Sequence, residues 1–186
     1  MLRLCFMVVV AAVSIPKLFG QRTTPEEAYS AFAMATGDSV SAKAMQFAFM
    51  VKRFATDDEI DKLAWILKEK GPDALRRELE RLNTGRIRPV QRVGNQIALA
   101  KKCQDGPYTV ITIVTAQQMP FTELYRSGQT IGYPFGFLQV KLNENGEGTG
   151  QIMAAAKIRF DKKNGHFEIE SYGNLYIRAI NVRPMN

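Results

Sequence analysis

The last third of the chain, from Tyr133 to Val182, alternates apolar and polar residues with few interruptions. A period of two places neighbouring side chains on opposite faces of a β-strand, so this pattern predicts strands with one buried face. Asn145-Gly146, Asn164-Gly165 and Gly173-Asn174 separate four such runs, and these residue types tolerate the positive φ angles of tight hairpins. We therefore expect a four-stranded antiparallel meander. The apolar positions of its second run are Ile152, Ala154, Ala156, Ile158 and Phe160.

The alternation also predicts which residues of the meander face the core. Ile158 and Ile169 are expected to point inward, whereas Lys157 and Glu168 are expected to point to solvent. An Ile169→Asp substitution should then unfold the domain, because it would bury an unpaired charge.

Two earlier runs predict a β-hairpin. Tyr29 to Thr36 is a strand of mostly small residues, and Ser41 to Ala55 carries alternating large apolar residues. Gly37-Asp38-Ser39 between them supplies the turn. The apolar face of the second run consists of Met45, Phe47, Phe49 and Val51.

A helical hairpin is predicted directly after these two strands. Thr56 and Glu59 have the spacing of a capping box, in which each side chain binds the backbone amide of the other residue. Apolar residues follow at helical spacing, Gly71 ends this first helix, and Pro72 suits the first turn of a second one. The two apolar stripes are Ile60, Leu63, Ala64 and Leu67, and then Leu75, Leu79 and Leu82.

Further strands are expected at Ile97 to Cys103 and Tyr108 to Thr115. The connection from Gln117 to Phe135 is rich in aromatic residues, and it could form a ligand site or a plug over the open end of the sheet. The fold class is therefore α+β. We expect an antiparallel β-sandwich or open barrel of about 8–9 strands, with a helical hairpin inserted after the second strand.

The N-terminus has the layout of a secretory signal peptide. Arg3 precedes the apolar run Leu4 to Val13, and Pro16 breaks the run shortly before Gly20. The run is too short for a membrane-spanning helix, which needs about 20 apolar residues. We expect residues 1–20 to be removed, residues 21–186 to form a single α+β domain, and the protein to be exported to the periplasm or the extracellular space.

The chain is basic, and it has few cysteines. The chain carries a net charge of +7, and basic residues cluster at Arg86, Arg88, Arg92, Lys101 and Lys102. A solvated surface is the simpler interpretation, and without interleaved aromatic residues the cluster does not predict a nucleic-acid site. Once the signal peptide is removed, Cys103 is the only cysteine. We expect it to be buried and inert, which is the commoner case, and a disulfide between two chains is the alternative.

The residues that could carry catalysis are few. His166 is the only histidine, so a site that needs several histidines or cysteines for zinc is excluded in the mature chain. Asp57 and Asp58 suit the start of a helix, and Glu168 and Glu170 suit an exposed strand face. We expect no cofactor and no metal site.

Several sequence blocks carry a resemblance to other proteins. The blocks include Phe54 to Glu59, Leu67 to Leu75, Tyr133 to Phe135, Ala156 to Lys163, Glu168 to Gly173 and Ile177 to Val182. Together they are similar to an uncharacterised family of small exported bacterial proteins of the acidobacterial type, for which no activity is known. The resemblance runs from about Tyr29 to Arg183, and it implies export and a shared architecture without implying any chemistry.

The leading functional hypothesis is an exported, non-enzymatic binding or envelope-interaction protein. Its partner would be an anionic envelope component or another exported protein. The alternatives are a barrel that carries a small apolar ligand and a carboxylate-based hydrolase. Aromatic and arginine side chains often supply binding energy at interfaces, so the expected binding residues are Arg86, Arg88, Arg92, Phe121, Tyr125, Tyr133 and Phe135.

Overall fold

The computed structural model of the protein describes residues 26–36, 44–121, 124, 132–161, 166–172 and 176–185. The predicted signal peptide and Tyr125 lie outside these residues. The described elements are β1 Glu27–Thr36, β2 Ala44–Val51, α1 Asp57–Lys70, α2 Pro72–Leu79, β3 Gly85–Pro89, β4 Asn95–Ile97, β5 Leu99–Asp105, β6 Tyr108–Thr115, β7 Phe135–Leu142, β8 Gly148–Asp161, β9 His166–Ser171 and β10 Tyr176–Pro184.

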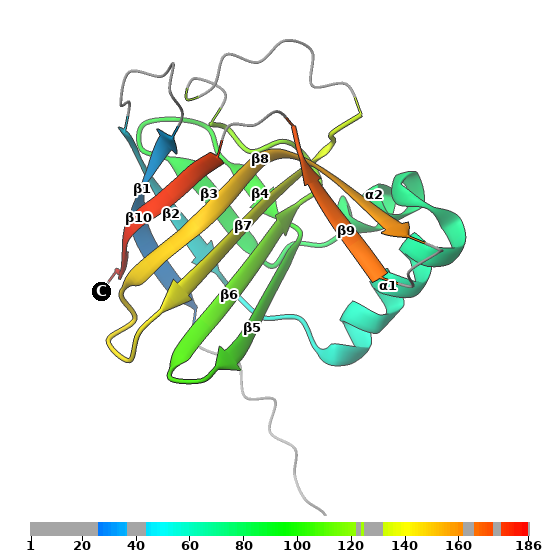
Figure 1. The fold of residues 1–186 in the computed structure, drawn as a ribbon, viewed down its shortest axis with the longest axis horizontal. Coiled ribbons are helices and arrows are strands. Elements are labelled where there is room, and N and C mark those ends of the chain that lie inside the picture. The colour runs from blue at the N-terminus through cyan, green and yellow to red at the C-terminus, as the bar shows by residue number, and fades with distance from the viewer. Residues whose placement is uncertain are drawn as a thin grey trace, which may run out of the picture.

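The strands form one antiparallel sheet that curls into a nearly closed barrel (Figure 1). Neighbouring strands follow the order β4-β3-β2-β1-β10-β8-β7-β6-β5, and β9 pairs with β8 outside this path. The two ends of the order, β4 and β5, are consecutive in the chain and are joined at Ala98, whose amide donates to the Val114 carbonyl at 3.0 Å. The α+β fold with a helical hairpin after the second strand is confirmed, with ten described strands in place of eight or nine.

The interior of the barrel is filled by large side chains. Phe47 and Phe49 of β2 are buried there, and Phe121 packs edge-on against Phe47 with ring centroids 5.2 Å apart. Met119 and Leu124 are buried in the same cluster. The part of the 117–135 connection that is described therefore acts as a plug, which is one of the two roles that the sequence allowed.

The plug fits because β7 carries a glycine beneath it. A side chain at Gly136 would bring a Cβ atom to 2.4 Å from Met119 Cγ and to 2.5 Å from the Thr115 hydroxyl oxygen. The missing side chain therefore allows Met119 to lie directly on the strand.

A second core lies outside the barrel, between the sheet and the two helices. Leu63 and Leu67 of α1 pack with Phe135 and Phe137 of β7 in this cluster. Figure 1 shows α1 and α2 beside one side of the barrel, near β9 and the far end of β8. The helices cover that side of the sheet, and no described helix covers the side of β1, β2 and β10.

A bulge in β8 explains how one strand serves both cores. Phe137 pairs with Met153, but Phe135 pairs with Ala156. Between these two pairs, two residues of β8 lie opposite one residue of β7. The extra residue reverses the alternation. Ala154 consequently belongs to the barrel interior, whereas Ala156 faces the helices. The sequence prediction that all five apolar positions of this run share one face is therefore wrong beyond Ala154.

The last step of the predicted meander is also wrong. β7, β8 and β9 pair in sequence order, but β10 pairs with β8 and β1 and not with β9. The reason is the length of β8, which has 14 residues. Its first part pairs with β10 at Ile152 and Ile177, and its last part pairs with β9 at Ile158 and Ile169.

The predicted burial of Ile169 is wrong as well. Ile158 is buried, but the facing Ile169 is 39 % exposed. Among the described strands β9 pairs only with β8 and lies at an edge, so the second core does not extend far enough to cover it. The carboxylate of an Ile169→Asp variant would remain hydrated, and the unfolding expected from sequence loses its physical basis.

The predicted capping box is confirmed. The Thr56 hydroxyl accepts from the Glu59 amide at 3.3 Å, and the Glu59 carboxylate accepts from the Thr56 amide at 3.0 Å. Arg53 donates to the same carboxylate at 2.9 Å. This hydrogen bond lowers the pKa of Glu59 below its ordinary value, with a further contribution from the Thr56 amide.

A single substitution tests the cap. Thr56→Ala removes the acceptor for the Glu59 amide and should lower the free energy of unfolding by about 1 kcal/mol, measured by urea denaturation. Thr56→Ser keeps the hydroxyl and should cost much less. Equal losses for both variants would show that the hydroxyl does not cap α1.

Candidate functional site

Three cations stand in neighbouring positions on the outer face of β2 and β3. Arg86 and Arg88 flank the fully buried Ile87, so both point away from the barrel interior. Arg86 pairs across the sheet with Met50, and Lys52 follows two residues later on the β2 side. Two residues along a strand span about 7 Å, which sets the spacing of Arg86 and Arg88.

These three cations differ from others in the predicted basic cluster. Lys101 forms an ion pair with Asp57, and Lys102 forms one with Glu27 at 2.7 Å. Across the described part of the chain, Lys52, Arg86 and Arg88 form no ion pair. Their charge therefore remains available to an anion.

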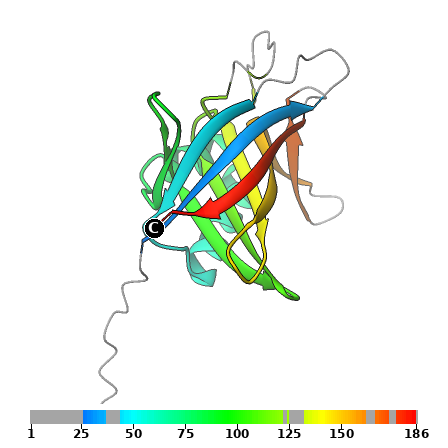
Figure 2. The same cartoon turned by 90° about the vertical axis from the view of Figure 1, so that its left-hand side faces the viewer.

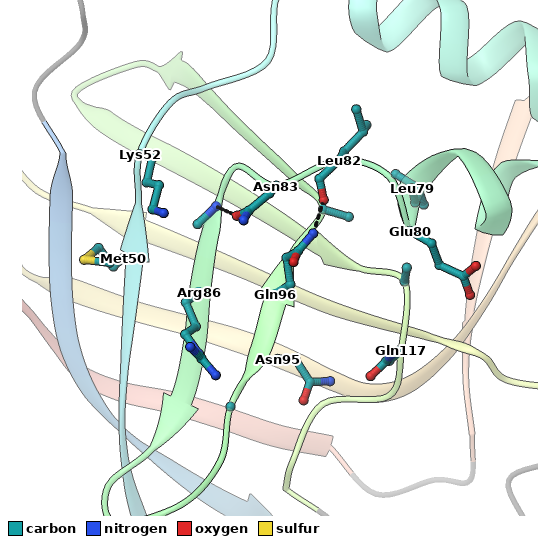
Figure 3. Close-up of a pocket in the computed structure, with 14 residues that line it drawn as sticks. Met50, Lys52, Leu79, Glu80, Leu82, Asn83, Arg86, Asn95, Gln96 and Gln117 are labelled. Carbon is teal, nitrogen blue, oxygen red and sulfur yellow. Dashed lines mark hydrogen bonds between the residues drawn. The ribbon is translucent and has the colours of Figure 1, made fainter.

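A hollow of about 660 Å³ lies beside this row (Figure 3). Figure 3 shows Lys52 and Arg86 on adjacent strands, with Gln96 beside Arg86 on β4 and Gln117 beyond it. Glu80 is the one carboxylate among the residues that line this hollow, and it accepts from Arg76 at 3.0 Å. The hollow is therefore basic and rich in hydrogen-bonding groups. Its amide side chains are Asn83, Asn95, Gln96 and Gln117.

Local contacts hold the walls of this hollow in place. The Gln96 amide donates to the Leu82 carbonyl at 2.5 Å, and the Asn83 side chain accepts from the Gly85 amide at 3.3 Å. A Cβ atom at Gly85 would lie 2.0 Å from the Met50 carbonyl oxygen, so only glycine allows β3 to approach β2 here. The hydrogen bonds of Gln96 and Asn83 join the segment after α2 to β3 and β4.

A second hollow of about 610 Å³ continues along the same face. It shares Met50, Arg86 and Gly94 with the first one, so Arg86 stands between the two. Arg88 and Arg92 also line it. The three arginines that the sequence singled out therefore meet in one place.

The turn after β3 closes the second hollow. A Cβ atom at Gly94 would lie 2.2 Å from the Ile87 carbonyl oxygen and 2.4 Å from Arg88 Cβ. Glycine therefore lets residues 90–94 fold closely over β3. Gln91 adopts a φ of 63° within this turn.

The structure places the predicted aromatic residues elsewhere. Phe121 and Phe135 are fully buried, in the barrel interior and in the second core respectively. The Tyr133 hydroxyl donates to Glu170 at 2.5 Å, and its ring meets Tyr172 edge-on at 5.2 Å. The hydrogen bond to Glu170 raises the pKa of Tyr133. None of these three rings lines either hollow, and Tyr125 lies outside the described residues.

The candidate carboxylates of a hydrolase already have partners. Arg159 donates to Glu168 at 2.7 Å and lies 3.9 Å from Glu170, which also receives the Tyr133 hydroxyl. Asp57 and Asp58 lie in the first turn of α1, as the sequence predicted. The side chain of His166 lies outside the described part.

Cys103 and Tyr29 are two further polar groups that the proposed site does not include. Cys103 is exposed on β5, so the expected burial of this cysteine is wrong. At one mouth of the barrel, Glu27 accepts from the Tyr29 hydroxyl at 2.9 Å, and burial together with this carboxylate raises the pKa of Tyr29. The described residues contain no group of three or more histidine, cysteine or acidic side chains placed to hold a metal ion.

Sequence reasoning missed Lys52 and the four amide side chains of the first hollow. Lys52 continues the outward-facing positions of β2, so strand alternation could have found it. The amide residues come from the end of α2, from β4 and from the segment after β6. Only the barrel brings these segments together.

Comparison of the chain with protein-family models, with curated proteins and with solved structures found no match. Among the described residues, no helix is both long and apolar enough to cross a membrane.

The plug can be tested apart from the basic face. Phe121→Ala should lower the free energy of unfolding by about 3–5 kcal/mol, because it empties part of the barrel interior. Phe121→Leu should cost less, and Arg88→Ala should leave stability close to that of the wild type, as measured by urea denaturation. An unchanged midpoint for Phe121→Ala would contradict the burial of this ring.

Proposed function

We propose that the chain is an exported, non-enzymatic binding protein that recognises an anionic component of the cell envelope. The binding surface is the basic face formed by the row Lys52, Arg86 and Arg88, with the amide side chains of the first hollow beside it. The single observation behind this proposal is that these three cations lack ion-pair partners among the described residues.

Chemistry favours a phosphate or carboxylate group as the ligand. Arginine binds such groups through two parallel hydrogen bonds, and charge-assisted bonds are stronger than neutral ones. The neighbouring amide side chains could bind hydroxyl or carbonyl groups of the same ligand. A polymer or a repeated headgroup would match the run of cations along β3.

Two observations favour this role over the alternatives. The carrier hypothesis needs space inside the barrel, where Phe47, Phe49 and Phe121 are packed together. The hydrolase hypothesis needs carboxylates with an accessible cleft, whereas Glu168 and Glu170 bind Arg159 on an edge strand.

Removing two arginines tests the proposal. The Arg86→Gln/Arg88→Gln variant should bind isolated cell envelopes and soluble inorganic polyphosphate at least about tenfold more weakly than the wild type, since it loses two charge-assisted contacts. Binding by the wild type should weaken as salt is added. Affinity is measured by cosedimentation for envelopes and by titration calorimetry for polyphosphate.

A matched control removes the same charge from the helical side. Lys70 and Arg77 are exposed on α1 and α2, and Lys70→Gln/Arg77→Gln should retain the wild-type affinity. Equal losses in both double variants would mean that only net charge matters, and undiminished binding in the arginine variant would refute the site.

Export is a separate part of the proposal with its own measurement. The protein expressed with its full N-terminus in a bacterium should be found outside the cytoplasm and should begin near Gln21. Mass spectrometry of the purified protein gives its first residue. A cytoplasmic product that retains residues 1–20 would contradict export.

A further inference from the structure

Exposed hydrophobic side chains are concentrated next to the basic face. Seven large hydrophobic side chains are exposed in the described part of the chain. Three of them have a partner: Lys70 lies over the Trp65 ring, Lys141 lies over the Tyr108 ring, and Ile169 faces Ile158. The remaining four are Phe32, Val90, Val93 and Met185.

Strand pairing joins these four residues into one surface. Phe32 of β1 faces Gln46 of β2, and the Gln46 carbonyl accepts from the Val90 amide at 2.9 Å. Val93 and Met185 line the second hollow together. The four side chains therefore border the same outer face as Arg86 and Arg88.

No described helix covers this face, and small residues lie at its centre. Figure 2 shows β2, β1 and β10 toward the viewer, with the helices on the far side of the barrel. Ala28, Ser30 and Ala48 occupy its middle, with Met50 facing Ala28. The described side chains that β1, β2 and β10 turn outward are small, apolar, amide-bearing or basic, and none is acidic.

Cations stand on both flanks of this face. Arg86, Arg88 and Arg92 lie on the side of β3 and its turn. On the other side, β10 places Arg178 opposite Met34 and Arg183 opposite Ser30. Arg183 lies 3.5 Å from Glu147 and is therefore partly neutralised.

We propose that this face docks on the surface of a lipid bilayer that contains anionic lipids. The flanking arginines contact the headgroup phosphates, while Val93 and Met185 enter the boundary between headgroups and acyl chains. A bilayer surface accepts both kinds of side chain at once, because buried apolar area and attraction to anionic lipids act together there. A soluble polyanion would match the arginines but would leave all four hydrophobic side chains in water.

This inference rests on the proposed function, since it names the bilayer as the source of the anionic groups. We expect the turn at 90–94 to be the part of the face that enters the bilayer surface. Val93 is 84 % exposed and follows Arg92 directly, so an apolar tip and a cation stand side by side. Met185 is 51 % exposed across the second hollow from it.

Vesicle cosedimentation tests the proposal. The wild-type protein should bind vesicles of phosphatidylcholine with phosphatidylglycerol and should bind pure phosphatidylcholine vesicles much more weakly. Val93→Asn/Met185→Gln should lower the affinity for the mixed vesicles by about tenfold, because two side chains lose their apolar burial. Arg86→Gln/Arg88→Gln should lower the affinity for the mixed vesicles by about fivefold for each arginine removed.

A matched control removes an exposed hydrophobic residue elsewhere. Trp65 is 54 % exposed on α1, and Trp65→Gln should leave vesicle affinity unchanged. Val93→Trp in a Trp65→Phe background places the only tryptophan at the proposed tip, and its emission should shift to shorter wavelength on the mixed vesicles. No shift would mean that the tip stays in water, which would overturn the proposal.

Soluble polyphosphate separates this inference from the function on which it rests. Val93→Asn/Met185→Gln should keep the wild-type affinity for polyphosphate while its affinity for vesicles falls. If the wild type binds polyphosphate through the arginines but does not bind vesicles, docking on a bilayer is refuted and the anion site is retained. Vesicle binding that depends on the arginines but not on Val93 or Met185 would refute insertion. If the arginine variant loses neither form of binding, both proposals fail.

Discussion

The filled interior of the barrel is the constraint on which the rest of the structure depends. Alternate residues of the strands along the barrel path must point inward, and the space they share is occupied by Phe47, Phe49 and Phe121. Closely packed interiors tolerate little change in volume. The plug residue Met119 fits only because Gly136 leaves room beneath it. With the interior occupied in this way, the surfaces that can meet a partner are those outside the barrel.

The bulge in β8 determines which outer surface is covered. By reversing the alternation after Ala154, it directs Ala156 toward the helices. α1 and α2 then have an apolar surface on one side of the sheet against which they can pack. The opposite side, formed by β1, β2 and β10, carries no described helix and turns small, apolar, amide-bearing or basic residues outward (Figure 2). The uneven distribution of hydrophobic residues along β8 thus leaves one face of the barrel free.

Charge gives this free face its chemical character. Some cations near the helices have a carboxylate partner, as Lys62 has Glu78 and Lys101 has Asp57. On the free face, Arg86 and Arg88 have no such partner among the described residues. Exposed ion pairs contribute little to stability, so leaving these arginines unpaired costs the fold little. That condition allows a basic surface to serve recognition, which is the role we propose.

Much of the local structure was determined by the sequence alone. The capping box at Thr56, the hairpin of β1 and β2 and the helical pair follow from patterns within a few residues, and short-range patterns survive in any tertiary context that buries the same face. The outward direction of Arg86 and Arg88 follows from the same alternation. Tertiary structure decided the remainder. The pairing of β10 with β8 depends on the length of β8, and the exposure of Ile169 depends on β9 being an edge. The placement of Val93 and Met185 around one hollow depends on the pairing of β10 with β1, of β1 with β2 and of β2 with β3, which joins segments that lie far apart in the chain and that no local pattern relates.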